Sequence, residues 1–73
     1  MKNYYVIYGD FANTYKVYSA EKMETKAALL ERGAEKITRK KAVDLCNAEK
    51  ERRLYGGNGG FATAAIIDAE ETI

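Results

Sequence analysis

The chain has 73 residues, of which 47% are hydrophobic and 32% charged, and its formal net charge is +1. This length and composition predict one small globular domain over residues 1–73 and exclude a disordered chain. Because the net charge is close to zero, composition favours neither a nucleic acid nor a membrane as partner. The chain contains no histidine and one cysteine, which excludes a disulfide framework and a Cys/His zinc site.

Two stretches in the first quarter of the chain have the composition of β-strands. Residues 3–8 and 15–18 are rich in aromatic and β-branched side chains, and turn-forming residues occupy 9–14 between them. This pattern predicts a β-hairpin. Apolar side chains point to both faces of the first strand, so we expect both faces of the sheet to be at least partly covered.

A helix is predicted over residues 20–32. Its apolar side chains recur at alternating spacings of three and four residues, which is the pattern of one helix face. Ser19 is suited to cap its start and Gly33 to follow its end. The side chains expected to face the sheet are Ala20, Met23, Ala27, Leu30 and Ala34.

A second helix is predicted over residues 39–54. Thr38 is suited to be its N-cap, and Ile37 is an apolar staple residue before it. Its charged second half, residues 47–53, is expected to project past the body of the domain. Cys46 is interpreted as a core residue. The apolar side consists of Ala42, Val43, Cys46 and Leu54, with Leu45 at its margin.

A glycine-rich segment at residues 56–60 ends this helix. Residues 57–62 formally match G-x-G-x-x-A, but a helix precedes the segment and a strand is expected after it, the reverse of a dinucleotide-binding loop. We therefore interpret the segment as a connector. Residues 61–67 alternate and predict a third strand, with a short alanine-rich helix as the alternative, and residues 68–73 are expected to form a short acidic tail.

Together these elements predict an α+β fold of order β-β-α-α-β. The simplest packing is a three-stranded antiparallel sheet with both helices on one face. No apolar run approaches the roughly 20 residues of a membrane span, and the first residues lack the apolar segment of a signal peptide. We therefore expect a cytoplasmic protein with no membrane partner.

Basic side chains crowd the expected start of the second helix. Cations there oppose the helix dipole, and acidic residues would be more stable. Basic residues that cost local stability indicate a binding role. An anion docked at the helix start would meet both free backbone N–H groups and basic side chains. The alternative is a solvated surface balanced by Glu35 and Asp44. The basic residues are Lys36, Arg39, Lys40 and Lys41, with Lys50 and Arg53 further along the helix.

Five of the six tyrosines fall in the expected hairpin. Two sheet faces and two helices cannot bury them all, so some are expected at the surface. Exposed tyrosines occur in protein interfaces and also stack on nucleic-acid bases, while the alternative is ordinary packing in the core and across strands. We name Tyr4, Tyr8 and Tyr18 as candidate binding residues.

No catalytic constellation is recognisable in the sequence. Cys46 has no histidine to serve as its base, the carboxylates form no recognisable pair, and no metal-ligand spacing occurs. We therefore expect no enzyme activity, no catalytic residue, no cofactor and no metal.

These observations favour a protein that acts by binding. The leading hypothesis is a non-enzymatic protein-binding module, a small regulator or inhibitor of a larger macromolecular machine. Size and lack of chemistry alone suggest the type that bacteriophages and mobile elements encode against host defence systems. The alternative is a small nucleic-acid-binding protein that uses the basic helix start on phosphates and hairpin tyrosines on bases. Homodimerisation is a further way for so short a chain to gain stability.

Overall fold

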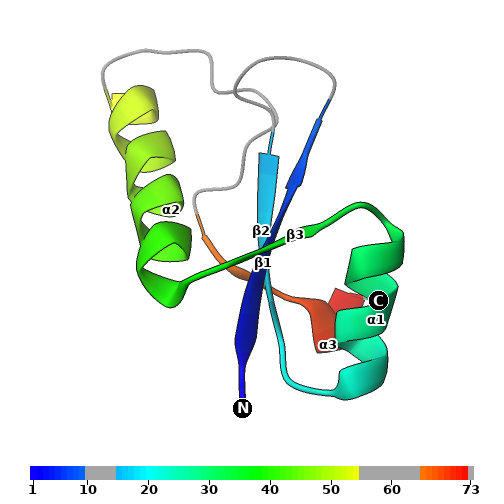
Figure 1. Cartoon of the computed structure of the whole chain (residues 1–73). Helices are drawn as coiled ribbons and strands as arrows, with labels where there is room; N and C mark the ends of the chain where they lie inside the picture. Colours follow the sequence, from blue (N-terminus) through cyan, green and yellow to red (C-terminus); the bar gives the residue numbers. More distant parts are fainter. Residues whose placement is uncertain (10–14, 55–64, 73) are drawn as a thin grey trace.

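The computed structural model describes residues 1–9, 15–54 and 65–72, the side chains of 52–54 excepted. Within these residues the chain forms four strands and three helices (Figure 1). They are β1 (Asn3–Tyr8), β2 (Tyr15–Ala20), α1 (Met23–Glu31), β3 (Glu35–Ile37), α2 (Arg39–Leu54), β4 (Ile67–Asp68) and α3 (Ala69–Thr72). The predicted α+β class is confirmed, while the predicted order β-β-α-α-β omitted β3 and α3.

The predicted hairpin forms the centre of the sheet. β1 pairs antiparallel with β2, from Asn3 opposite Ala20 to Tyr8 opposite Tyr15. The strand order is β3-β1-β2-β4, so both hairpin strands have a neighbour on each side. The loop was predicted over residues 9–14, of which 10–14 lie outside the described residues.

The prediction of a three-stranded antiparallel sheet is wrong, because the described sheet has four strands and one parallel pair. β3 pairs antiparallel with β1, where Ile37 lies opposite Tyr4. β4 pairs in parallel with β2, on the other side of the hairpin. β3 has three residues and buries only Ile37, so its sequence carries too little alternation to indicate a strand.

The prediction of a strand over residues 61–67 is wrong for residues 65–66, which the structure describes. Residues 65–66 lie before β4, and the strand itself is only Ile67–Asp68. Residues 61–64 and the glycine-rich segment at 56–60 lie outside the described residues. The expected acidic tail contains α3 instead, and its first turn is capped by Asp68, whose Oδ1 accepts a hydrogen bond from the Glu70 backbone N–H (3.0 Å).

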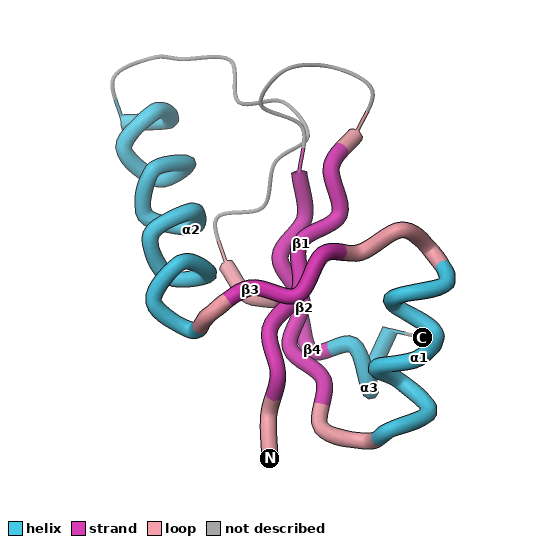
Figure 2. Tube along the Cα trace, in the orientation of Figure 1, coloured by secondary structure: helices cyan, strands magenta, loops and turns pink. Residues whose placement is uncertain are grey.

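The helices pack on opposite faces of the sheet, and not on one face as predicted (Figure 1 and Figure 2). α2 covers one face, while α1 and α3 cover the other. The hairpin explains this arrangement, because the paired residues Val6 and Val17 belong to the core under α2, whereas Tyr5 and Ala20 belong to the core under α1 and α3. A sheet that is apolar on both faces requires a cover on each.

α1 packs through a different side from the one predicted. Leu29 is 0% exposed, whereas Met23 and Leu30 are 85% and 54% exposed. Ala27, which lies between them on the same helix face, is also exposed. The inner side includes the half-buried Thr25, whose polarity conceals this second helical stripe in the sequence. Of the stripe predicted from the spacing, Met23, Ala27 and Leu30 therefore face away from the sheet, whereas Ala20 in β2 and Ala34 after the helix are buried in the core.

α1 begins later than the predicted helix over residues 20–32. Ser19 and Ala20 belong to β2, where both are buried, so Ser19 is not the helix cap. Lys22 occupies the N-cap position instead, and its side chain makes no capping hydrogen bond.

The end of α1 agrees with the prediction for Gly33. This residue has a φ of +86°, and its N–H bonds to the carbonyl oxygen of Leu30 (3.0 Å). The N–H of Ala34 bonds to the carbonyl oxygen of Leu29 (3.0 Å), which completes a Schellman motif. Because Leu29 and Ala34 also share a core cluster, the motif fixes the one leucine that anchors the helix.

α2 spans the predicted residues 39–54. The predicted cap is confirmed, since Thr38 Oγ1 accepts a hydrogen bond from the Lys41 backbone N–H (3.1 Å). Ile37 and Ala42 lie in one core cluster on either side of the cap, in the arrangement of a hydrophobic staple.

The buried side of α2 contains Ala42, Cys46 and Glu49, with Leu45 half-buried beside them. The prediction that Cys46 is a core residue is therefore confirmed. Val43, at 39% exposed, lies off this side. The full burial of Glu49 contradicts the expectation that the charged second half of the helix projects past the body.

The two adjacent leucines of α1 provide a matched test of its orientation. We expect Leu29→Ala to lower the free energy of unfolding by about 2–5 kcal/mol, because it empties a fully buried position. We expect Leu30→Ala to change it by less than about 0.5 kcal/mol, because that side chain is largely exposed. Urea unfolding of both variants measures the difference, and equal losses would contradict this orientation.

Candidate functional site

The basic residues predicted to bind lie around the first turn of α2. Arg39, Lys40 and Lys41 are all exposed, and no acidic residue occupies that turn. Consecutive helical residues are separated by about 100° around the axis, so these three side chains leave the helix in three directions. Lys36 is exposed on β3, on the flank where Lys41 also lies.

Lys36 and Lys41 line a shallow hollow of about 370 Å³ along the open edge of β3. Glu35 lines the same hollow, so its charge is mixed. Lys50 lies nine residues beyond Lys41, about 13 Å along the helix. The side chain of Arg53 is outside the described residues. Lys36, Arg39, Lys40 and Lys41 thus lie together around the start of α2, whereas Lys50 lies in its second half. The described basic residues do not form one uniform positive face.

The three candidate tyrosines are divided between the two sheet faces. Tyr4 is half-buried against the core under α2, and Tyr18 is half-buried against the core under α1 and α3. Tyr8 is 56% exposed at the end of β1. Tyr5 and Tyr15 are buried, and the Tyr15 hydroxyl donates a hydrogen bond to the carbonyl oxygen of Leu45 in α2 (2.7 Å). The hairpin tyrosines therefore serve largely as core, and Tyr8 alone among these five presents most of its ring.

The structure reveals an apolar surface that sequence reasoning assigned to the core. Met23, Ala27 and Leu30 lie at positions i, i+4 and i+7 of α1, and all three are exposed. We call these three residues the α1 outer face. Figure 2 shows α1 beside α3, on the side of the sheet opposite α2. The spacing identified the stripe, but only the burial of Leu29 shows which way the helix is turned.

Charged residues flank the α1 outer face on both sides. By helix geometry, Glu24 and Glu31 lie on one flank and Lys26 on the other. Both glutamates are exposed, and Lys26 is half-buried. The Lys26 Nζ donates a hydrogen bond to the carbonyl oxygen of Met1 (2.8 Å). The face is therefore an apolar strip with an acidic border and a basic border.

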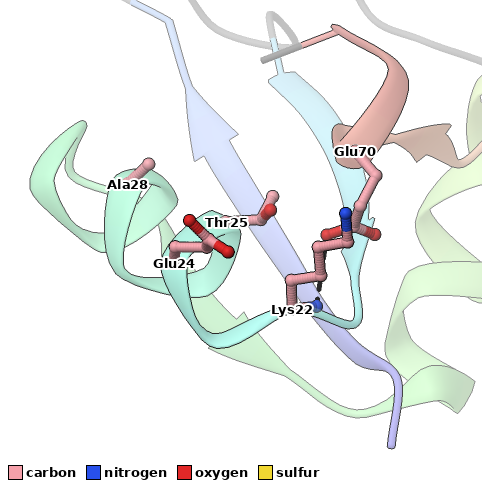
Figure 3. Close-up of a pocket in the computed structure, with 5 residues that line it drawn as sticks. All are labelled: Lys22, Glu24, Thr25, Ala28 and Glu70. Atoms are coloured by element: carbon pink, nitrogen blue, oxygen red, sulfur yellow. Dashed lines mark hydrogen bonds between the residues drawn. The ribbon is translucent and has the colours of Figure 1, made fainter.

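A carboxylate from α3 occupies the start of α1, where the helix lacks a cap of its own. Glu70 accepts hydrogen bonds from the backbone N–H of Glu21 (3.0 and 3.1 Å) and from that of Lys22 (3.3 Å). Figure 3 shows the Glu70 carboxylate close to Lys22 and Thr25, beside a hollow of about 310 Å³ that Glu24 and Ala28 also line. Glu70 thus binds the backbone N–H groups of the two residues that precede α1 and ties α3 to the start of that helix, across 48 residues of sequence.

The folded structure shifts the pKa values of Glu70 and Cys46. Desolvation alone would raise the pKa of Glu70, but hydrogen bonds from Thr25 and the Glu21 and Lys22 backbones, with the charge of Lys22, outweigh it and lower that pKa. Burial raises the pKa of the Cys46 thiol, and the positive charge of Lys50 offsets part of that rise. The thiol is therefore protonated at neutral pH and poorly suited to act as a nucleophile.

Among the described residues, no group of three or more cysteine, aspartate and glutamate side chains is placed to hold a metal ion. The described helices also include none that combines the length and apolar character of a membrane span.

The chain was compared with protein-family models, with curated proteins and with solved structures, and no significant match was found in any of the three comparisons.

The Glu70 contact predicts a specific response to acid. A carboxylate whose pKa is lowered by folding stabilises the protein above its unfolded pKa of about 4.3, and this contribution is lost as the pH falls through the folded pKa. We therefore expect Glu70→Gln to be less stable than wild type at pH 7 and the gap to shrink below about pH 4. Thermal unfolding between about pH 3 and pH 7 measures this gap, with Glu71→Gln as the matched control. A constant gap would contradict this stabilising role of the ionised Glu70 carboxylate.

Proposed function

We propose that this chain is a non-enzymatic protein-binding module that engages other protein chains through the α1 outer face. One observation carries the proposal: Met23, Ala27 and Leu30 align on one exposed face of a helix whose opposite face is anchored in the core by Leu29. Single exposed apolar residues are ordinary on protein surfaces. Three aligned on one helix face form a strip that water solvates poorly, and such strips are typical of binding surfaces.

The spacing of the strip corresponds to a known way in which proteins recognise helices. A helix that binds in a groove presents apolar anchors at i, i+3 or i+4 and i+7. Met23, Ala27 and Leu30 provide such a set on a helix that is already folded, so little conformational entropy is lost on binding. In the finer form of the proposal, the chain regulates or inhibits a larger macromolecular machine, a form supported by its size and by the lack of a metal-binding group among the described residues.

A second candidate function is nucleic-acid binding through the start of α2. It is favoured by three consecutive exposed basic residues, Arg39, Lys40 and Lys41, at the positive end of the helix dipole. The division of these side chains among three directions, with Glu35 beside Lys36 and Lys41, weakens it. The half-buried state of Tyr4 and Tyr18 weakens it further, because neither ring lies free for base stacking.

A charge reversal tests the second candidate. We expect Arg39→Glu combined with Lys40→Glu to raise the free energy of unfolding by about 0.3–1 kcal/mol per residue, because acidic side chains suit the start of a helix. If these residues bind phosphates, the double variant loses affinity for nucleic acid although it is more stable than wild type. Binding to single- and double-stranded DNA and RNA at several salt concentrations measures this, and affinity unchanged by the reversal would exclude the second candidate.

Affinity capture tests the first candidate. We expect nuclease-treated lysate from the source cells to yield bound proteins with wild type, and the yield to fall at least fivefold with Leu30→Glu. Val43→Glu is the matched control, since it adds the same charge at a partly exposed apolar position on α2. Circular dichroism confirms that each variant is folded. Capture that survives Leu30→Glu, or that disappears with nuclease, would contradict the proposal.

A further inference from the structure

Over one heptad, the α1 outer face has apolar residues at the positions where a coiled coil carries them. Helices that pair in this way carry apolar side chains at positions a and d of a seven-residue repeat, flanked by charged residues at e and g. On α1, Met23 and Leu30 occupy d positions seven residues apart, and Ala27 occupies the a position between them. All three are exposed, so the seam is available for a partner helix.

The other positions of the repeat agree with this register. Leu29 falls at c and Thr25 at f, on the side opposite the seam. Leu29 is fully buried in the chain's own core, and Thr25 is half-buried and hydrogen-bonded to Glu70 of α3, so the seam points away from the domain. A second α1 can therefore approach the seam while both domain bodies remain on the far sides of their helices.

The charged borders select the partner and its direction. Lys26 falls at g, while Glu24 and Glu31 fall at e. In a parallel pair, a g residue meets the e residue five positions later in the partner, so Lys26 of each chain meets Glu31 of the other. In an antiparallel pair, g meets g and e meets e, so lysine would face lysine and glutamate would face glutamate. The Lys26 ammonium has three donors, so its bond to the Met1 carbonyl oxygen leaves further donors for a carboxylate.

We propose, resting on the function proposed above, that the partner of the α1 outer face is a second copy of this chain, bound with the two α1 helices parallel. The seam from Met23 to Leu30 is about 10 Å long. An interface of that length is smaller than those of stable complexes, so the dimer is weak and its dissociation constant falls between about 10 μM and 1 mM.

Sedimentation equilibrium of the full chain tests the proposal. Between about 10 μM and 1 mM, the average mass of wild type rises from one chain toward two, whereas Leu30→Glu stays at one chain and Val43→Glu behaves as wild type. Glu31→Lys places lysine opposite Lys26 and weakens a parallel dimer by about three- to tenfold. The same change would strengthen an antiparallel dimer, because the introduced lysine would then face Glu24 of the other chain, so stronger association overturns the parallel arrangement.

A cysteine at position 23 tests the direction independently. In a parallel pair the two copies of position 23 are adjacent, so oxidised Met23→Cys forms a disulfide-linked dimer, while wild type, whose one cysteine is buried, does not. A wild type that stays monomeric at 1 mM overturns this inference but leaves the proposed function intact if capture still depends on Leu30. If Leu30→Glu changes neither the sedimentation of the chain nor the capture of other proteins, both this inference and the proposed function are overturned.

Discussion

The antiparallel pairing of β1 with β2 is the interaction on which the remaining structure depends. Both strands lie in the interior of the sheet, and their side chains alternate between two separate cores. Val6 and Val17 create the apolar surface that α2 covers, and Tyr5 and Ala20 create the one that α1 and α3 cover. Because one hairpin supplies both cores, a shift of its register by one residue would exchange them and leave neither helix with a matching surface.

The elements that local chemistry determines were predictable from the sequence. Thr38 followed by a long polar-apolar pattern identified α2, and Gly33 identified the end of α1. The face of α1 was not predictable in the same way, because both Leu30 and Leu29 belong to helical stripes. The longer apolar stripe contains Leu30. Leu29 nevertheless is the leucine that enters the core, because the Schellman motif and the contact with Ala34 hold it there. In a three-layer domain of this size, one buried leucine anchors a nine-residue helix.

The short elements and the candidate surface depend on long-range contacts that no local pattern encodes. Ile37 is the one buried residue of β3, and the two residues of β4 become a strand only where they lie beside β2. Glu70 resembles an ordinary acidic residue in sequence, although the pair Asp68 and Glu70 does carry the signal of a helix start. The basic cluster was located correctly at the start of α2, but the mixture of charge around it becomes visible only when β3 is placed alongside.

The parallel pairing of β2 with β4 has a consequence for how the chain acquires its structure during synthesis. Tyr18 and Ser19 pair with Ile67 and Asp68, so about fifty intervening residues must emerge before this edge of the sheet exists. The backbone N–H groups of Glu21 and Lys22, just before α1, also lack their carboxylate acceptor until Glu70 has been made. Contacts between residues so distant in sequence slow folding, because the loop must close before they contribute. The emerging chain therefore exposes one edge of its central hairpin throughout most of its synthesis.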